Sequence, residues 1–479
     1  MVPENVWNGL FSPKSVAVIG ASNSVGSWGE RITKQLLSSK NRLVYAINPG
    51  YPEILGLPSY KSILDIPDPV DLGIIVVRAE LVPGALRELA EKKVPTALII
   101  SGGFSETDEA GARLQDEIVE IANRGGIRFI GPNTMGHLDT FAGMNSLSFM
   151  ENIPKGPVSL IAQSGNMGSR IMQNVIRHGI GLNKFVCCGN EADITLEDYL
   201  EYFAGDPETK IIMLYVEGLR DARRFLEVAG KITKTKPVVV MKAGGTKNSA
   251  RASRSHTGAL AGSDAAYTAA FRQAGVIRVE DDDELCDVSI ALLNQPLPRS
   301  NRVGILTMGG GLGVVTAEAC EKEGLEIAEL GSSTVEKLDE MLPSRWSHSN
   351  PVDLVGSNIG NGPDIMSVLW ILMQDVNLDI IISNAWLGRM NRIPQNTPTA
   401  EHNENPDSEK KKVKEFSRQV KKYNKPLLMI GSPPQRPSDL EAFTLFHKEG
   451  FLVYPQPNRA AKTLRHMIWY KQYLESSNA

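Results

Sequence analysis

Ser15-Val16-Ala17-Val18-Ile19-Gly20-Ala21-Ser22 decides the fold of the first part of this chain. A mostly apolar, β-branched run passes into glycine, alanine and serine, which predicts a buried strand ending in a turn of small residues. Gly26 and Gly29 follow, and we expect a helix to begin near Glu30. Such a turn lets backbone N–H groups approach a pyrophosphate at the helix N-terminus, where the helix dipole favours negative charge. The stretch therefore predicts a parallel α/β unit that binds a nucleotide through Gly20, Ala21, Ser22 and Gly26.

The same alternation of strand, glycine turn and helical segment recurs along all 479 residues. We predict strands in three groups: 15–19, 43–47, 72–77, 96–100 and 127–130; 158–162, 184–188, 211–216, 238–241 and 275–279; and 303–308, 325–328, 380–383, 427–430 and 451–454. A polar, proline-rich stretch at 294–301 predicts a linker, and residues 390–412 predict an exposed excursion. We expect three doubly wound α/β domains, at 1–145, 150–295 and 300–475.

Composition excludes several classes of function. The formal net charge of −4 supplies no basic field for nucleic acid or for an anionic membrane. No apolar run approaches the ~18 residues of a membrane span, and the first residues lack the pattern of a secretory signal. Four cysteines, at 187, 188, 286 and 320, have neither metal-ligand nor disulfide-framework spacing. We expect a cytoplasmic protein with buried thiols and no metal site.

The residues at the end of the second predicted strand distinguish between NAD and coenzyme A as the ligand. An NAD-binding unit carries an acidic residue there for the ribose, whereas this strand ends in Asn48-Pro49. Coenzyme A suits the same glycine turn without that carboxylate. Arg78, Ser101 and Asn133 follow further strands, and the carboxyl ends of parallel strands converge on one crevice. Each of these turns also suits an ordinary loop.

A second phosphate site is predicted where the strand at 158–162 ends. Gln163-Ser164-Gly165-Asn166 follows it and opens a helix, so that the Ser164 hydroxyl and the free N–H groups of Gly165 and Asn166 suit an anion. The alternative is that Ser164 simply caps the helix. The position at a carboxyl edge favours the phosphate site.

The chemistry is predicted to centre on His256, which lies in Ser255-His256-Thr257-Gly258-Ala259-Leu260-Ala261-Gly262-Ser263. Neutral imidazole is a nucleophile, and small neighbours let a phosphoryl group approach the ring. Glu217 follows the strand at 211–216, where its carboxylate suits one ring nitrogen of His256. Lys242 ends a neighbouring strand and suits a phosphate. A solvated surface role is the alternative for Glu217 and Lys242.

Taken in order, these motifs resemble the NDP-forming acyl-CoA synthetases of the succinyl-CoA synthetase superfamily, in particular the α subunits of ADP-forming acetate–CoA ligases. The resemblance rests on segments spread over the whole chain, and the segment around His256 is the most specific. These segments are residues 18–22, 47–49, 131–133, 163–165, 216–218, 255–264 and 350–354. Three positions depart from the family pattern: Thr134 replaces the usual Cys, Arg78 the usual Pro, and Trp28 enlarges the first glycine turn.

The resemblance implies a Rossmann-like CoA-binding domain followed by two flavodoxin-like domains. It also implies a relay in which acyl-CoA and phosphate give an acyl phosphate, and His256 carries the phosphoryl group to ADP, which the family binds with Mg²⁺. Glu217 would orient His256, and Gln163, Ser164 and Gly165 would hold the phosphate. The family's ATP-grasp module needs roughly 200 residues that this chain has no room for. We therefore expect a separate β subunit, as in an α₂β₂ assembly, and a small carboxylic acid as substrate.

Two other readings stay open at this stage. A CoA-sensing scaffold would keep the fold without turnover, although such a sensor needs neither His256 nor Glu217. An NAD-dependent oxidoreductase conflicts with Asn48 at the ribose position and lacks an acid–base pair beside a nicotinamide.

Overall fold

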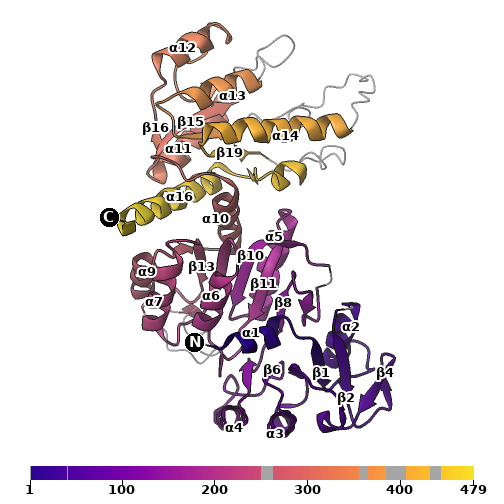
Figure 1. The fold of residues 1–479 in the computed structure, drawn as a ribbon. Coiled ribbons are helices and arrows are strands. Elements are labelled where there is room, and N and C mark those ends of the chain that lie inside the picture. Colours follow the sequence, from indigo (N-terminus) through magenta and orange to yellow (C-terminus); the bar gives the residue numbers. More distant parts are fainter. Residues whose placement is uncertain are drawn as a thin grey trace. The chain divides into compact units, whose positions relative to one another are not determined.

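In the computed structural model, the chain divides into two compact units, residues 1–282 and 283–479 (Figure 1). The structure describes residues 2–39, 41–150, 152–246, 248–249, 263–354, 365–384, 406–431 and 444–478. In these ranges no helix has both the length and the apolar character to cross a membrane.

The first sheet of unit 1 has seven strands in the order β3-β4-β2-β1-β5-β6-β7. Only β3 runs antiparallel, against β4. The strands are β1 (Ser15–Ile19), β2 (Leu43–Ile47), β3 (Glu53–Ile54), β4 (Leu57–Tyr60), β5 (Leu72–Ile75), β6 (Thr96–Ile99) and β7 (Arg128–Ile130). The helices are α1 (Glu4–Phe11), α2 (Trp28–Ser38), α3 (Val82–Lys92) and α4 (Glu109–Gly125), with short 3₁₀ turns at Ile63–Asp65 and Ala79–Leu81. Because β1 pairs with β2 on one side and β5 on the other, the winding direction reverses at β1.

The second sheet of unit 1 has the order β14-β13-β12-β10-β11-β8-β9. Its strands are β8 (His137–Asp139), β9 (Met144–Asn145), β10 (Lys155–Ala162), β11 (Leu182–Cys187), β12 (Ile211–Val216), β13 (Val238–Lys242) and β14 (Ile277–Val279). The helices described here are α5 (Gly165–Arg177), α6 (Leu196–Gly205), α7 (Ala222–Ile232) and α9 (Asp264–Gln273). Here the winding direction reverses at β10, which pairs with β11 and with β12.

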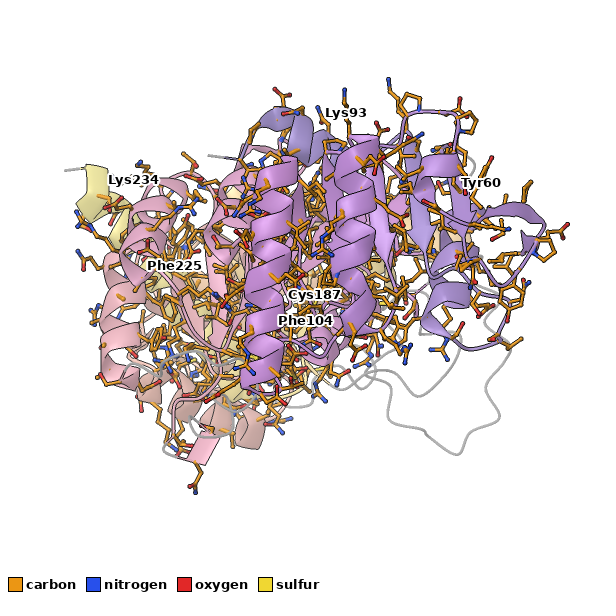
Figure 2. All side chains as sticks on the ribbon, turned by 90° about the horizontal axis from the view of Figure 1, so that it is seen from below. Tyr60, Lys93, Phe104, Cys187, Phe225 and Lys234 are labelled. Carbon is orange, nitrogen blue, oxygen red and sulfur yellow. The ribbon has the colours of Figure 1, made fainter. Side chains whose placement is uncertain are left out.

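The two sheets share one continuous hydrophobic core. It runs from Val16 and Ile74 of the first sheet to Val186 and Ile212 of the second, and includes the α6 residue Phe203. Figure 2 shows Phe104 and Cys187 among packed side chains, whereas Lys93 and Lys234 lie at the surface.

A backbone ladder also joins the two sheets, since the N–H groups of residues 187, 190, 192 and 194 donate to carbonyls of the 129–136 segment. The carboxyl ends of β1 and β10 are therefore held within one packed body.

Unit 2 contains a parallel sheet in the order β16-β15-β18-β19-β20, with β17 also paired to β15. Its strands are β15 (Arg302–Thr307), β16 (Glu326–Ile327), β17 (Val352–Asp353), β18 (Ile380–Ser383), β19 (Leu427–Ile430) and β20 (Val453–Tyr454). The helices described are α10 (Asp282–Asn294), α11 (Gly310–Lys322), α12 (Ser332–Asp339), α13 (Ile365–Gln374), α14 (Pro406–Tyr423) and α16 (Pro457–Asn478). Within this unit, Arg459 of α16 ion-pairs with Asp287 of α10 at 2.7 Å.

The α/β class and the parallel sheets expected from the sequence are confirmed, and each of the fifteen predicted strands has a counterpart. Residues 137–145 pair with the second sheet, so the first sheet ends at β7, ahead of residue 145. The chain divides into its two units at residues 282/283, at the start of α10, and residues 295–301, between α10 and β15, form neither helix nor strand. The last part of the expected excursion at 390–412 is helical, because residues 406–423 form α14. Residues 390–405 lie outside the described ranges.

Candidate active site

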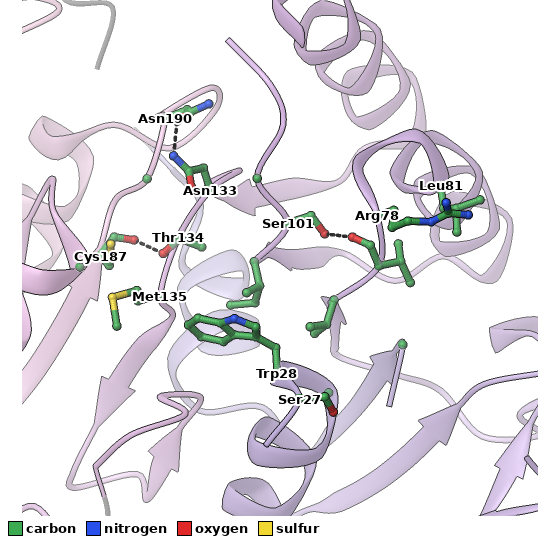
Figure 3. A pocket seen from close by; sticks show the side chains of 18 of the residues that line it. Ser27, Trp28, Arg78, Leu81, Ser101, Asn133, Thr134, Met135, Cys187 and Asn190 are labelled. Carbon is green, nitrogen blue, oxygen red and sulfur yellow. Dashed lines mark hydrogen bonds between the residues drawn. The ribbon is translucent and has the colours of Figure 1, made fainter. Parts of the chain in front are cut away.

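A pocket of about 830 Å³ lies in unit 1, where the carboxyl ends of the two sheets meet (Figure 3). Its walls come from the turns after β1, β2, β5, β6 and β7 of the first sheet and after β10 and β11 of the second. The turns at both reversal points, after β1 and after β10, line it. Open α/β sheets bind ligands at such positions.

The turn after β1 brings the backbone of α2 against the end of the strand. Gly20 has φ +96°, and a Cβ on Gly29 would lie 2.1 Å from the Gly20 carbonyl oxygen, so neither position accommodates another residue without rearrangement. The Asn48 side-chain amide donates to the Ala21 carbonyl at 2.8 Å and so ties the end of β2 to this turn. Ser27 caps α2 by accepting from the Glu30 N–H at 3.2 Å. The helix N-terminus consequently faces the pocket beside small residues.

The remaining strand ends of the first sheet supply one cation and two fixed polar groups. Arg78 is exposed, and its guanidinium has no hydrogen bond or ion pair within the described part of the chain. The Ser101 hydroxyl donates to the Val77 carbonyl at 2.5 Å. Asn133 has φ +58°, and its side chain donates to Asn190 at 3.2 Å (Figure 3). Among the described residues that line the pocket, Arg78 thus has the one charged side chain.

The turn after β10 forms the other end of the pocket. Ser164 is the N-cap residue of α5 by position, but its hydroxyl makes no capping hydrogen bond. A Cβ on Gly165 would lie 1.9 Å from the Met135 sulfur, so this glycine permits close packing between the halves of unit 1. The first N–H groups of α5 and the Ser164 hydroxyl are therefore available to an anion. Ser164 thus occupies the N-cap position that the alternative gave it, but without a capping hydrogen bond from its side chain.

The Gln163 amide is fully engaged within the protein. Its nitrogen donates to Glu191 and to the Gly218 carbonyl, each at 2.8 Å. Its oxygen accepts from the N–H groups of Glu217 at 2.6 Å and Gly218 at 3.1 Å. Gln163 lines the pocket, but all of its amide groups hold the edge of the second sheet together.

Glu217 and Lys242 lie together behind this edge, outside the pocket lining. The Glu217 side chain is 8% exposed and contacts the Tyr215 hydroxyl, and burial together with this carboxylate raises the pKa of Tyr215. The Lys242 ammonium donates to the Glu217 carbonyl at 2.8 Å and lies 4.4 Å from the centroid of the Tyr267 ring. Burial lowers the pKa of Lys242, with a further contribution from Arg278. The Lys242 ammonium is thus already held by carbonyl and ring contacts.

The structure brings ten of the predicted site residues into one pocket lining: Gly20, Ser22, Asn48, Arg78, Ser101, Asn133, Gln163, Ser164, Gly165 and Asn166. Five others lie outside that lining: Ala21, Gly26, Pro49, Glu217 and Lys242. His256 lies outside the described residues.

Several pocket residues were not predicted from the sequence. Trp28, the first residue of α2, is 42% exposed and places its indole in the pocket. Asn190 joins both halves of unit 1, since its amide nitrogen donates to Glu106 at 2.5 Å and its amide oxygen accepts from Asn133. Glu191 is buried beside it. The Gly189-Asn190 dipeptide after a strand was an available signal, but burial of the next glutamate had no signature in the sequence.

Comparison with known proteins gives a family match for each half of unit 1. Residues 14–139 match the model of a CoA binding domain, and residues 155–292 match that of a succinyl-CoA ligase like flavodoxin domain. The α subunit of acetate–CoA ligase [ADP-forming] II from Pyrococcus furiosus is 44% identical over 374 residues, which are 78% of this chain and 81% of that one. The α subunit of acetate–CoA ligase [ADP-forming] I from the same organism is 37% identical over 471 residues, 95% of this chain and 96% of that one.

A solved structure gives the same result. The dinucleotide forming acetyl-coenzyme A synthetase 1 of Ca. Korarchaeum cryptofilum, in complex with phosphate and ADP, superposes with a TM-score of 0.84 at 30% identity and covers 99% of both chains. The chain spans only 54% of the length of another curated relative, to which it is 43% identical.

These matches define the class, an α/β acid–thiol ligase with a CoA-binding domain. Within that class, the chain belongs to the family of α subunits of ADP-forming acyl-CoA ligases, which includes the two acetate–CoA ligase α subunits named above.

Proposed function

We propose that this chain is the α subunit of an ADP-forming acyl-CoA synthetase that interconverts acyl-CoA, ADP and phosphate with a carboxylic acid, CoA and ATP. Phosphate attacks the thioester carbonyl and displaces CoA, which gives an acyl phosphate. A ring nitrogen of His256 then attacks phosphorus and releases the carboxylate. The phosphoryl group on His256 finally passes to ADP, and the ring is regenerated.

One observation carries this proposal: a single pocket joins a glycine turn suited to a pyrophosphate to a helix N-terminus whose serine hydroxyl makes no capping hydrogen bond. Gly20, Gly29 and Arg78 lie at one end, and Ser164, Gly165 and Asn166 at the other. CoA extended between them would bring its thioester towards the second end, where phosphate is accommodated. The phosphate there would attack the thioester and then transfer to His256, with Glu217 orienting the ring and Lys242 behind it.

The nucleotide is proposed to bind a partner. Two relatives of this family are named as α subunits, which implies a second subunit for each of them. We propose that a β subunit with an ATP-grasp module supplies ADP and Mg²⁺, in an α₂β₂ assembly, in the cytoplasm. The domain limits 1–145, 150–295 and 300–475 and the small carboxylic acid substrate are part of the same proposal.

The test is phosphorylation of the reconstituted pair with γ-labelled ATP and Mg²⁺. We expect acid-labile, base-stable label on His256 and none on His256→Ala. Label that persists in that variant would refute the assignment. For Glu217→Gln we expect a loss of labelling rate of about 10²-fold with CoA binding retained, which isothermal titration measures. The isolated chain is expected to bind CoA without forming a thioester from ATP.

A further inference from the structure

A buried carboxyl group lies directly behind the phosphate end of the pocket. Glu191 follows the pocket residues Gly189 and Asn190, and its side chain is 4% exposed. Its two carboxylate oxygens accept separate hydrogen bonds, one from the Gln163 amide at 2.8 Å and one from the Leu196 N–H at 3.2 Å. The Cys188 thiol also bonds to this carboxylate. All three neighbours are donors, so the site is built for an acceptor.

No cation forms an ion pair with Glu191 among the residues that the structure describes. The titratable and charged groups that face it are Glu197 and Tyr199 of α6, Arg220 after β12, and Cys188 directly after β11. Arg220 is exposed and donates instead to the Asn190 carbonyl. Burial therefore dominates and raises the pKa of Glu191 to about 7.

Glu191 is the one side chain among the four groups that fix the orientation of the Gln163 amide; the other three belong to the backbone of Glu217 and Gly218. In the observed orientation, the amide nitrogen faces the Glu191 carboxylate and the Gly218 carbonyl, and the oxygen faces two N–H groups. A flipped amide would set its oxygen against the carboxylate and its N–H groups against those of Glu217 and Gly218. Every contact would then join two acceptors or two donors. The carboxylate is thus at the start of a chain of hydrogen bonds that ends on the backbone of Glu217.

We propose that Glu191 is a positioning residue for phosphoryl transfer, which fixes the Gln163 amide and, through it, the Glu217 backbone at the edge of β12. This role rests on the proposed function, because Glu217 is the residue assigned to His256. Glu191 acts without touching substrate. The ionised carboxylate holds the Gln163 amide by accepting its hydrogen bond. Protonation weakens this hold, because a protonated carboxyl oxygen is a donor and its neighbours are donors too.

The experiment compares phosphorylation rates of the reconstituted pair carrying Glu191→Gln with those of the wild-type pair. The control is Glu227→Gln, which removes an exposed carboxylate of α7 whose ion-pair partner Arg223 is exposed too. We expect a loss of about tenfold in rate for Glu191→Gln near pH 8.5, with the CoA dissociation constant changed less than about twofold. The ratio of wild-type to variant rates should fall towards one near pH 5.5, because the wild-type carboxyl is then protonated.

A double-mutant cycle with Gln163→Met tests whether the effect passes through Gln163. We expect Glu191→Gln to add nothing in the Gln163→Met background. Three results would each overturn the positioning role: rate losses of the two substitutions that multiply in the double variant, a ratio of wild-type to Glu191→Gln rates that does not change with pH, or a wild-type phosphorylation rate in Gln163→Met. The third result can be obtained even if Glu191→Gln does not fold. Absence of label in the wild-type pair would instead refute the proposed function.

Discussion

The stability of unit 1 should depend on the ionisation of Glu191. The pKa of this carboxyl is 4.5 in an unperturbed glutamate and about 7 in the folded chain. The folded state therefore binds the proton more tightly than the unfolded chain. Below about pH 4.5 the carboxyl is protonated in both states, and its ionisation costs the folded state nothing. As the pH rises, the ionised carboxylate lowers the free energy of unfolding, and this loss is complete above about pH 7. Glu191→Gln removes this titration.

The magnitude follows from the shift. A difference of about 2.5 pKa units at 1.36 kcal/mol per unit corresponds to about 3 kcal/mol at full ionisation. Between about pH 5.5 and 8.5, the part that develops is about 2 kcal/mol. The free energy of unfolding of the variant should thus rise by about 2 kcal/mol relative to that of the wild type over this interval. Loss of the carboxylate contacts adds a cost that does not depend on pH.

Amide hydrogen exchange of β11 and β12, followed by mass spectrometry of their peptides, measures the opening free energy of this region at each pH. Glu227→Gln is the control, because it removes a carboxylate from the exposed surface of α7, where its ion-pair partner Arg223 is exposed too. A difference between Glu191→Gln and wild type that stays constant within about 0.5 kcal/mol from low to high pH would refute the reasoning.

Two further predictions concern the ends of the pocket. Gly29→Ala places a Cβ 2.1 Å from the Gly20 carbonyl oxygen, so we expect at least about a tenfold loss of CoA affinity by calorimetry, whereas Gly84→Ala, with open space at its Cβ, should leave affinity unchanged. Unaltered binding by Gly29→Ala would show that the turn after β1 is not a ligand site. Ser164→Ala should slow phosphoryl transfer about tenfold and change the free energy of unfolding by less than about 0.5 kcal/mol, since its hydroxyl does not cap α5. Ser27→Ala removes the cap of α2 and should lower the free energy of unfolding, measured in urea, by about 1 kcal/mol. The reverse pattern of stabilities would contradict this contrast.

The strands and the pocket turns were predictable because they depend on local pattern. Apolar runs such as 211–216 are buried along their whole length and appear in the sequence as uninterrupted hydrophobic segments. The small residues at Gly20 and Gly165 mark close backbone or side-chain approaches, and such approaches leave a visible signature.

Other parts of the site depend on contacts between distant residues. The sequence predicts Gln163 as a phosphate ligand, but its amide is hydrogen-bonded to Glu191, Glu217 and Gly218. These residues follow two different strands. The burial of Glu191 depends on packing against α6, so nothing in its own neighbourhood distinguishes it from a surface glutamate. Pairing of β8 with β11 likewise could not be anticipated, because a three-residue strand carries too little periodicity.

That antiparallel pairing has a practical consequence for anyone who wishes to dissect the protein. A fragment starting at residue 150 would lack β8 and β9, and β11 would present an open row of backbone donors and acceptors to solvent. Unprotected rims of this kind recruit strands from other molecules and promote aggregation. A fragment that starts between β7 and β8 would keep β8 paired with β11. The cut would, however, fall in the segment between β7 and β8 that lines the middle of the pocket.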